Sequence, residues 1–350
     1  MENDNKQQHQ RRVRYKGTHP RSYNEKYKEL HPEKYADTVA KVIQKGSTPA
    51  GMHISICVRE ILDFLQIKPG QIGLDATLGY GGHTLEMLKC LDHQGHMYAL
   101  DVDPIELSKT RERLAALGYG PEILTIRQMN FANIDQIAAE GGPFDFILAD
   151  LGVSSMQIDN PERGFSYKTD GPLDLRLNPQ KGETAAQRLR SVSQKELAGM
   201  LTENADEPYA QQISRAVMRE FKRGNEIATT KQLRDVIAQA LAFLPEEERA
   251  EAVKKSCQRT FQALRIDVNS EFEVLYEFLD KLPGALKSGG RVAILTFHSG
   301  EDRLVKKSFR QLKNVGVYED ICSEVIRPSA QECVKNPRAK STKMRWAVKA

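Results

Sequence analysis

Three glycines, at positions 79, 81 and 82, follow a short apolar segment and precede a helical pattern, as in a ligand-binding turn. Glycine lets the backbone approach a ligand, and the free N–H groups of a helix start attract its polar atoms. Asp101 lies 22 residues beyond Gly79, at the end of the next apolar segment. An acid there can accept hydrogen bonds from both hydroxyls of an unphosphorylated ribose. The pattern indicates a nucleoside site, although a tight turn without a ligand would show the same glycines.

The glycine spacing favours one class of nucleoside cofactor over others. A dinucleotide fingerprint requires glycine at its sixth position, where this chain has Thr84, and no Gly-Lys-Ser/Thr follows as in a P-loop. S-adenosylmethionine has a ribose, an adenine and an amino-acid end, but no phosphate. The sequence therefore predicts S-adenosyl-L-methionine as the cofactor.

Short apolar segments must position these residues. They lie at 72–77, 97–100, 123–126 and 144–149, and helical patterns separate them. Strands that alternate with helices predict an α/β fold with a doubly wound, Rossmann-like parallel sheet. In such sheets ligands bind beyond the carboxyl ends of the strands. Phe131, which follows the third segment, and Asp150, which closes the fourth, are therefore predicted to join Asp101 at the site.

The alternation stops after residue 150. Residues 151–180 are rich in glycine and proline, residues 183–245 are predicted helices, and apolar residues at 261–279 are typical of one long helix. Further strands are predicted at 291–297 and 344–348. Helices should begin at Asp103-Pro104, with the aspartate as N-cap, and at Ser299, through a capping box with Asp302.

From these patterns we predict three parts of the chain. They are a basic extension (1–50), an α/β sheet domain that holds the predicted cofactor site (51–155 and 258–350) and a helical insertion (156–257).

Composition excludes several classes of protein. Of the 350 residues, 40% are hydrophobic and 28% charged, which is too apolar for a wholly disordered chain. The apolar runs are far shorter than a membrane span, and the polar N-terminus does not resemble a signal peptide. We therefore expect a cytoplasmic protein that does not bind membranes. Five cysteines without a Cys-x-x-Cys pair predict reduced thiols and no metal site.

Charge is distributed unevenly along the chain. Residues 1–50 carry 11 Lys/Arg against 6 Asp/Glu, and residues 301–350 carry 12 against 6, so the remaining middle has a net charge of −7. Basic ends on an acidic body favour a polyanionic partner. Lysine-rich termini that serve only solubility would look the same.

Several motifs, in order across residues 53–340, resemble the MraW/RsmH family of S-adenosylmethionine-dependent methyltransferases, which modify cytosine N4 in small-subunit ribosomal RNA. The motifs are Asp75-Ala76-Thr77-Leu78-Gly79-Tyr80-Gly81-Gly82-His83, Asp150-Leu151-Gly152-Val153-Ser154-Ser155, Glu162-Arg163-Gly164-Phe165-Ser166, Asp170-Gly171-Pro172-Leu173-Asp174-Leu175-Arg176, Arg259-Thr260-Phe261-Gln262-Ala263-Leu264-Arg265-Ile266, Phe297-His298-Ser299 with Glu301-Asp302, and Asn336-Pro337-Arg338-Ala339.

The resemblance implies a set of cofactor contacts. They are Gly81, Gly82, His83, Asp101, Phe131, Asp150 and Gln157. His83 and Gln157 come from the resemblance alone; a polar residue at a helix start and a solvated loop residue are the alternatives. The resemblance also implies the small ribosomal subunit or its RNA as partner, and suggests a homodimer.

The chain departs from the family in three places. Met156 stands where proline is usual, Gly300 where leucine is usual, and residues 1–50 have no counterpart in an ordinary member. These departures suggest a paralogue. They leave open a methyltransferase of the same fold whose RNA target is set by the extension, and a non-catalytic ribosome-assembly factor.

Residues just after the fourth strand have types that suit RNA. Arg163, Phe165 and Arg176 could contact phosphate or stack on a base that has left its helix. Alternatively Phe165 anchors the loop and Arg176 pairs with Asp170 or Asp174. The acceptor amine needs a hydrogen-bond acceptor, for which the Asp174 side chain and the backbone carbonyls of 151–155 are candidates. His298 could contact RNA or make a structural hydrogen bond.

Overall fold

The computed structural model describes residues 55–350, so the predictions for residues 1–50 lie outside the described part of the chain. The sheet has seven strands. They are β1 (Ile72–Asp75), β2 (His96–Asp101), β3 (Leu124–Gln128), β4 (Phe144–Asp150), β5 (Leu286–Thr296), β6 (Tyr318–Ile321) and β7 (Lys343–Lys349).

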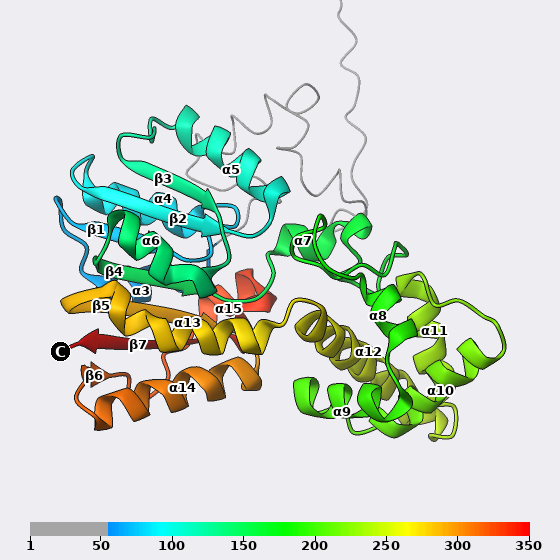
Figure 1. Ribbon diagram of the computed structural model, residues 1–350. Coiled ribbons are helices and arrows are strands. Elements are labelled where there is room, and N and C mark those ends of the chain that lie inside the picture. The colour runs from blue at the N-terminus through cyan, green and yellow to red at the C-terminus, as the bar shows by residue number, and fades with distance from the viewer. Residues whose placement is uncertain (1–54) are drawn as a thin grey trace, which may run out of the picture. The chain divides into compact units, whose positions relative to one another are not determined.

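The strand order is β3-β2-β1-β4-β5-β7-β6 (Figure 1). The first five strands pair in parallel, whereas β7 is antiparallel to both β5 and β6. The sheet and its helices confirm the predicted α/β doubly wound fold, including the last strand near residue 346. The sequence analysis missed β6, because its four residues, Tyr-Glu-Asp-Ile, lack an apolar run.

Helices cover both faces of the sheet, which explains why its central strands are apolar without alternation. In β4, Phe146 and Leu148 join one buried cluster, and Ile147 and Ala149 join the other. The first cluster includes α3 (Val58–Leu65), α4 (Gly82–Leu91) and α5 (Pro104–Ala116). The second includes α6 (Ile134–Gly141), α13 (Glu271–Ala285) and α14 (Ser299–Asn314).

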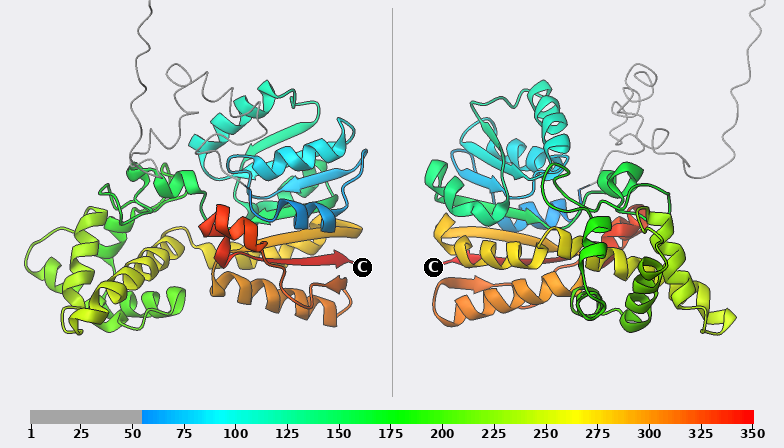
Figure 2. Two further views of the ribbon diagram at one scale, coloured as in Figure 1. Left: turned by 180° about the vertical axis from the view of Figure 1, so that it is seen from behind. Right: turned by 45° about the vertical axis from the view of Figure 1, so that its right-hand side comes forward.

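A group of helices follows β4 and precedes β5. They are α7 (Ser155–Asp159), α8 (Ala185–Ser191), α9 (Gln194–Ala205), α10 (Ala210–Lys222), α11 (Thr230–Ala240) and α12 (Glu246–Val268). Helices α8 to α12 pack around a third apolar cluster of their own, and Figure 2 shows them gathered beside the sheet. The predicted boundary at residue 257 falls inside α12, and the division into domains stays a prediction.

Two local predictions were wrong. The apolar residues at 261–279 belong to two helices, α12 and α13. The first helix ends before Asn269, and the second begins after Ser270, whose φ of 50° is not helical. Ser299 does not cap α14. The N-cap is His298 without a side-chain cap, and Asp302 instead binds Lys343 and Arg345.

Other local predictions were confirmed. Asp103 caps α5 through the N–H groups of Ile105 and Glu106, with Pro104 in the first turn. Among residues 55–350, no helix is both long and apolar enough to cross a bilayer.

Candidate functional site

A pocket of about 370 Å³ opens at the carboxyl ends of the parallel strands. All seven residues predicted to bind the cofactor line it: Gly81, Gly82, His83, Asp101, Phe131, Asp150 and Gln157. Parallel strands bring their carboxyl ends to one edge of the sheet, so residues up to 76 positions apart meet there. Their roles in binding stay predictions.

The glycine-rich turn joins β1 to α4. Leu78 N–H donates to the Leu100 carbonyl over 2.7 Å, and Gly81 N–H donates to the Leu78 carbonyl over 2.6 Å. Gly81 has φ 73°, and a Cβ there would lie 2.7 Å from the Thr110 side chain of α5. The glycine is therefore required by the fold as well as by the approach of a ligand.

Asp101 closes β2 with its carboxylate held by the backbone. Oδ2 accepts the Gly79 N–H over 2.7 Å, and Oδ1 accepts the Asp103 N–H over 2.8 Å. Burial raises the pKa of Asp101 to about 6, against the lowering effect of these two N–H groups. Each oxygen keeps acceptor capacity, so the carboxylate has the acceptors that two ribose hydroxyls need.

Asp150 and His83 form a second polar pair. His83 Nε2 lies 2.9 Å from the Ile56 carbonyl, which can only accept, so this nitrogen carries the proton. Its Nδ1 lies 3.5 Å from Asp150 Oδ2. Burial raises the pKa of Asp150 to about 6; His83 lowers it, and Asp75 and Glu301 raise it.

The other oxygen of Asp150, Oδ1, is buried and has no hydrogen-bond partner among residues 55–350. A buried acceptor without a partner is costly unless a ligand supplies a donor. The ammonium of an amino acid is such a donor. Together with Asp101, this atom makes the pocket chemically suited to S-adenosyl-L-methionine.

Phe131 begins a short 3₁₀ turn after β3, η2 (Phe131–Asn133). Its half-buried ring packs edge-on against Phe278, with centroids 5.1 Å apart. One side of the ring is thus fixed by the protein, and it lines the pocket where an adenine would need an apolar surface.

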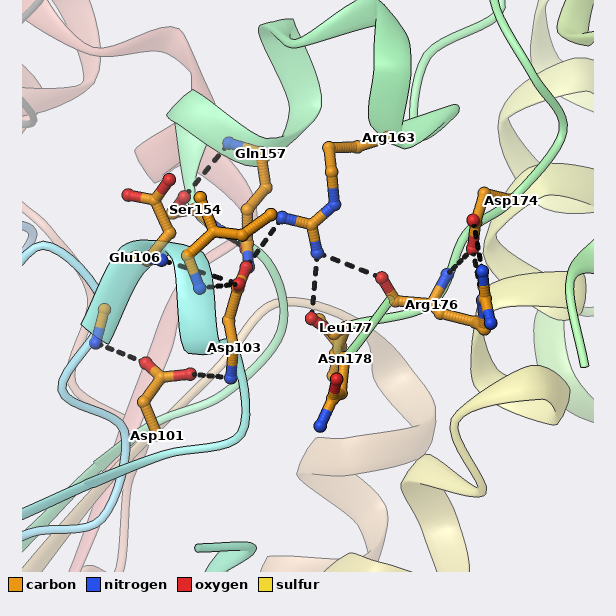
Figure 3. A network of polar contacts seen from close by, with 12 residues as sticks. Asp101, Asp103, Glu106, Ser154, Gln157, Arg163, Asp174, Arg176, Leu177 and Asn178 are labelled. Carbon is orange, nitrogen blue, oxygen red and sulfur yellow. Dashed lines mark hydrogen bonds and ion pairs between the residues drawn. The ribbon is translucent and has the colours of Figure 1, made fainter. Parts of the chain in front are cut away.

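Gln157 lines the pocket, but its amide is engaged by the protein (Figure 3). Its Oε1 accepts the Ser154 N–H over 2.9 Å, and its Nε2 donates to Asp103 Oδ2 over 2.8 Å. Asp103 lies two residues after Asp101 and donates its backbone N–H to the Asp101 carboxylate. The Gln157 amide thus fixes this corner of the pocket, and its predicted contact with the cofactor stays a prediction.

Arg163 ends the 3₁₀ turn η3 (Pro161–Arg163) and is buried. Its Nη1 donates to Asp103 Oδ2 over 2.7 Å, and its Nη2 donates to the carbonyls of Arg176 and Leu177 (Figure 3). The guanidinium is thus used inside the protein. Its predicted RNA contact stays a prediction, and in this conformation Arg163 has a structural role.

The other residues predicted to bind substrate are also engaged by the protein. Arg176 makes a bidentate ion pair with Asp174, at 2.7 Å for each bond, which is one of the alternatives stated above. Phe165 is buried in the cluster of α8 to α12, so it anchors the loop. His298 Nε2 lies 3.1 Å from Glu301 Oε1, to which it can donate when this nitrogen carries the ring hydrogen. None of these four lines the pocket.

The sequence analysis gave no role to five charged residues that do line the pocket, among them Glu106 and Arg338. The other three are Arg265 of α12, Glu271 at the start of α13 and Glu301 in the first turn of α14. The Arg265 guanidinium binds Glu271 through two bonds of 2.7 and 2.8 Å. Arg265 and Glu301 lie inside motifs of the family resemblance but had no role assigned to them. Their place in these motifs was the signal that could have identified them as site residues.

Glu271 and Glu301 also belong to a cluster of possible metal ligands, together with His298. The ligand atoms of Glu271, His298 and Glu301 lie within 4.8 Å of one another. Arg265 already supplies this cluster with a positive charge through its pair with Glu271.

Comparison with known proteins places the chain among methylases. A family model described as "MraW methylase family" matches residues 50–350. The chain is 73% identical over 342 residues to "Ribosomal RNA small subunit methyltransferase H 1" of Lachnoclostridium phytofermentans, covering 98% of this chain and 93% of that protein. It is 39% identical over 302 residues to "Ribosomal RNA small subunit methyltransferase H" of Koribacter versatilis, covering 85% of this chain and 94% of that protein.

The difference in coverage concerns the N-terminal region. A match over 98% of the chain includes most of residues 1–50, and a protein named "Ribosomal RNA small subunit methyltransferase H 2" of Alkaliphilus metalliredigens matches 99% of the chain at 68% identity. These relatives thus share sequence in the extension.

Proposed function

The chain belongs to the MraW methylase family and is a methyltransferase that uses S-adenosyl-L-methionine; we propose that it methylates N4 of a cytidine in small-subunit ribosomal RNA. The observation that carries the proposal is that Asp101, Phe131 and Asp150 meet the glycine-rich turn in one pocket. The names of the relatives support the RNA target.

We assign the cofactor's parts by chemistry. Asp101 binds the ribose hydroxyls, and Phe131 contacts the adenine. The turn at 81–83 and Asp150 bind the amino-acid end, whose ammonium is a partner for Asp150 Oδ1. Gln157 supports this arrangement through Asp103.

S-adenosyl-L-methionine supplies an activated methyl group. In the transfer, a bond forms between the acceptor nitrogen and the methyl carbon while the carbon–sulfur bond breaks and its electrons remain on sulfur. The amine then loses one proton to water. The protein's task is to align the nitrogen with the methyl group and exclude competing water. The cytidine must leave its base stack to enter the pocket.

The proposal is tested by mapping modified nucleotides in ribosomal RNA of a strain that lacks the protein. We expect one N4-methylated cytidine of the small subunit to be lost, and to return with the wild-type gene but not with Asp101→Ala. Unchanged N4-methylation would contradict the proposal. A missing methyl group elsewhere in RNA would support a different target set by residues 1–50.

Calorimetry separates an enzyme from a non-catalytic assembly factor. We expect S-adenosyl-L-methionine to bind with measurable heat, and Asp101→Ala to weaken binding. An absence of binding by the wild-type protein would leave only the assembly role. The homodimer stays a prediction.

A further inference from the structure

The pocket extends beyond the residues assigned to the cofactor. Gly81 and Phe131 follow β1 and β3, and Asp101 closes β2; these three strands form one side of the sheet. Asp150 closes β4, and Glu301 follows β5, the next strand in the order. The pocket therefore runs across the strand ends, from the nucleoside side past Asp150 to a part near β5.

The part near β5 contains Arg265, Glu271 and Glu301, which come from three different helices. The Arg265 guanidinium donates two N–H groups to Glu271. Among residues 55–350 it donates no other hydrogen bond. A guanidinium carries more N–H donors than these two, so some remain for a ligand. The side chain of Arg265 is only 14% exposed, and its pair with Glu271 fixes its position.

Glu301 is a fixed acceptor beside this donor. It is 3% exposed, and its Oε2 accepts the Phe297 N–H over 2.8 Å. Its other oxygen, Oε1, lies 3.1 Å from His298 Nε2, so both oxygens are held in place. An ionised carboxylate accepts several hydrogen bonds and donates none, so Glu301 can accept one more.

We propose that Arg265 and Glu301 bind the Watson–Crick edge of the acceptor cytosine, with Arg265 donating to N3 and O2 and Glu301 accepting from the N4 amine. This inference rests on the proposed function and names the residues that select the base. The nitrogen that accepts the methyl group would then lie between Glu301 and the cofactor side of the pocket.

The pair distinguishes cytosine from uracil. Uracil presents an N3–H donor where cytosine has an acceptor, and an oxygen where cytosine has the amine. The guanidinium would then face a donor and the carboxylate an oxygen, leaving buried charged groups without partners. Glu301 also has a second effect, because accepting a hydrogen bond from the amine directs the nitrogen lone pair toward the methyl group.

Kinetics test the role of Arg265. Small subunits from the deletion strain are methylated in vitro by wild type, Arg265→Lys and Arg265→Gln. We expect kcat/KM to fall about 10- to 100-fold in Arg265→Gln and less in Arg265→Lys, while the dissociation constant of S-adenosyl-L-methionine changes less than about twofold. Lys255→Gln, an exposed position on the same helix, is the control and should behave as wild type.

A binding experiment tests base selection directly. Cytidine and uridine monophosphates are added to the protein saturated with S-adenosylhomocysteine, and saturation-transfer NMR reports binding. We expect the wild type to prefer cytidine monophosphate, and Arg265→Gln and Glu301→Gln to lose the preference. If Arg265→Gln is unstable, the neutral pair Arg265→Gln with Glu271→Gln replaces it.

The outcomes separate this inference from the proposed function. Cytidine methylation that proceeds at the wild-type rate in Arg265→Gln, or a wild type that binds both monophosphates equally, would overturn the inference alone. Methyl transfer to a base other than cytosine would overturn both.

Discussion

Arg163 and Asp103, 60 residues apart in the sequence, form a buried ion pair of 2.7 Å between Nη1 and Oδ2. Asp103 also caps α5 and donates its N–H to Asp101. Arg163 donates to the carbonyl of Leu177, which lines the pocket. The pair thus joins the end of β2, at Asp101, to the segment of Leu177, another part of the pocket lining.

Removing this arginine should destabilise the protein. In Arg163→Ala the Asp103 carboxylate, 1% exposed, loses its cation, and we expect the free energy of unfolding to fall by about 3–5 kcal/mol. Denaturant titration measures the change. Arg190→Ala is the control, because its pair with Glu226 is largely exposed and should contribute less than about 1 kcal/mol. Equal losses in the two variants would refute a structural role for the buried pair.

Asp101 should determine cofactor affinity. In Asp101→Asn the side chain can still accept a backbone N–H, but it no longer offers two charged oxygens to the ribose. We expect the dissociation constant of S-adenosyl-L-methionine to rise about 10- to 100-fold by calorimetry, as for the loss of hydrogen bonds to a charged group. Asp235→Asn, at an exposed position, should leave affinity unchanged. Unaltered binding in Asp101→Asn would remove the ribose assignment.

Cofactor affinity should depend on pH. Burial raises the pKa values of Asp101 and Asp150 to about 6 from an ordinary value of 3.8. Both must be ionised to accept from the cofactor, so affinity should rise as pH increases through about 6. Calorimetry at about pH 5 and about pH 7 measures this change. In Asp101→Asn the slope should become shallower, and a profile as steep as that of wild type would contradict the contribution of Asp101.

The stability of the ligand-free protein should change in the opposite direction. Between about pH 4 and 6 the folded state holds protons on Asp101 and Asp150 that the unfolded state has released. The free energy of unfolding contributed by these groups therefore falls as pH rises through that window and is lowest above it. Thermal unfolding of wild type and Asp101→Asn isolates the effect of Asp101. The stability of the variant relative to that of wild type should be higher at pH 7 than at pH 5.

Gly164 should tolerate no side chain. It has φ 70°, and a Cβ there would lie 2.2 Å from the Pro172 carbonyl oxygen. Gly118 has φ 89° with nothing within 4 Å, so Gly118→Ala tests backbone strain alone, at about 1–2 kcal/mol. We expect Gly164→Ala to cost clearly more in denaturant titration. Similar costs would mean that the loop at residues 164–172 adapts.

The sequence by itself determined every strand of the sheet except β6, and also the residues at the carboxyl ends of β2 and β4. The carboxyl ends of parallel strands lie at one edge of the sheet whatever the order of the strands. Apolar segments ending at Asp101 and Asp150 were therefore enough to predict a common site. The helix cap at Asp103 was equally local, because it depends only on neighbouring backbone N–H groups.

Only the tertiary structure decided which charged groups meet. Arg163 has the residue type of an RNA contact, yet it lies buried on Asp103, and Arg265, Glu271 and Glu301 come from three helices to one end of the pocket. An arginine's long side chain can reach any nearby carboxylate, so its partner depends on packing and not on local sequence. For the same reason the break at Asn269 was invisible, since its side chain binds the backbone of Leu175 and Leu177, more than 90 residues away.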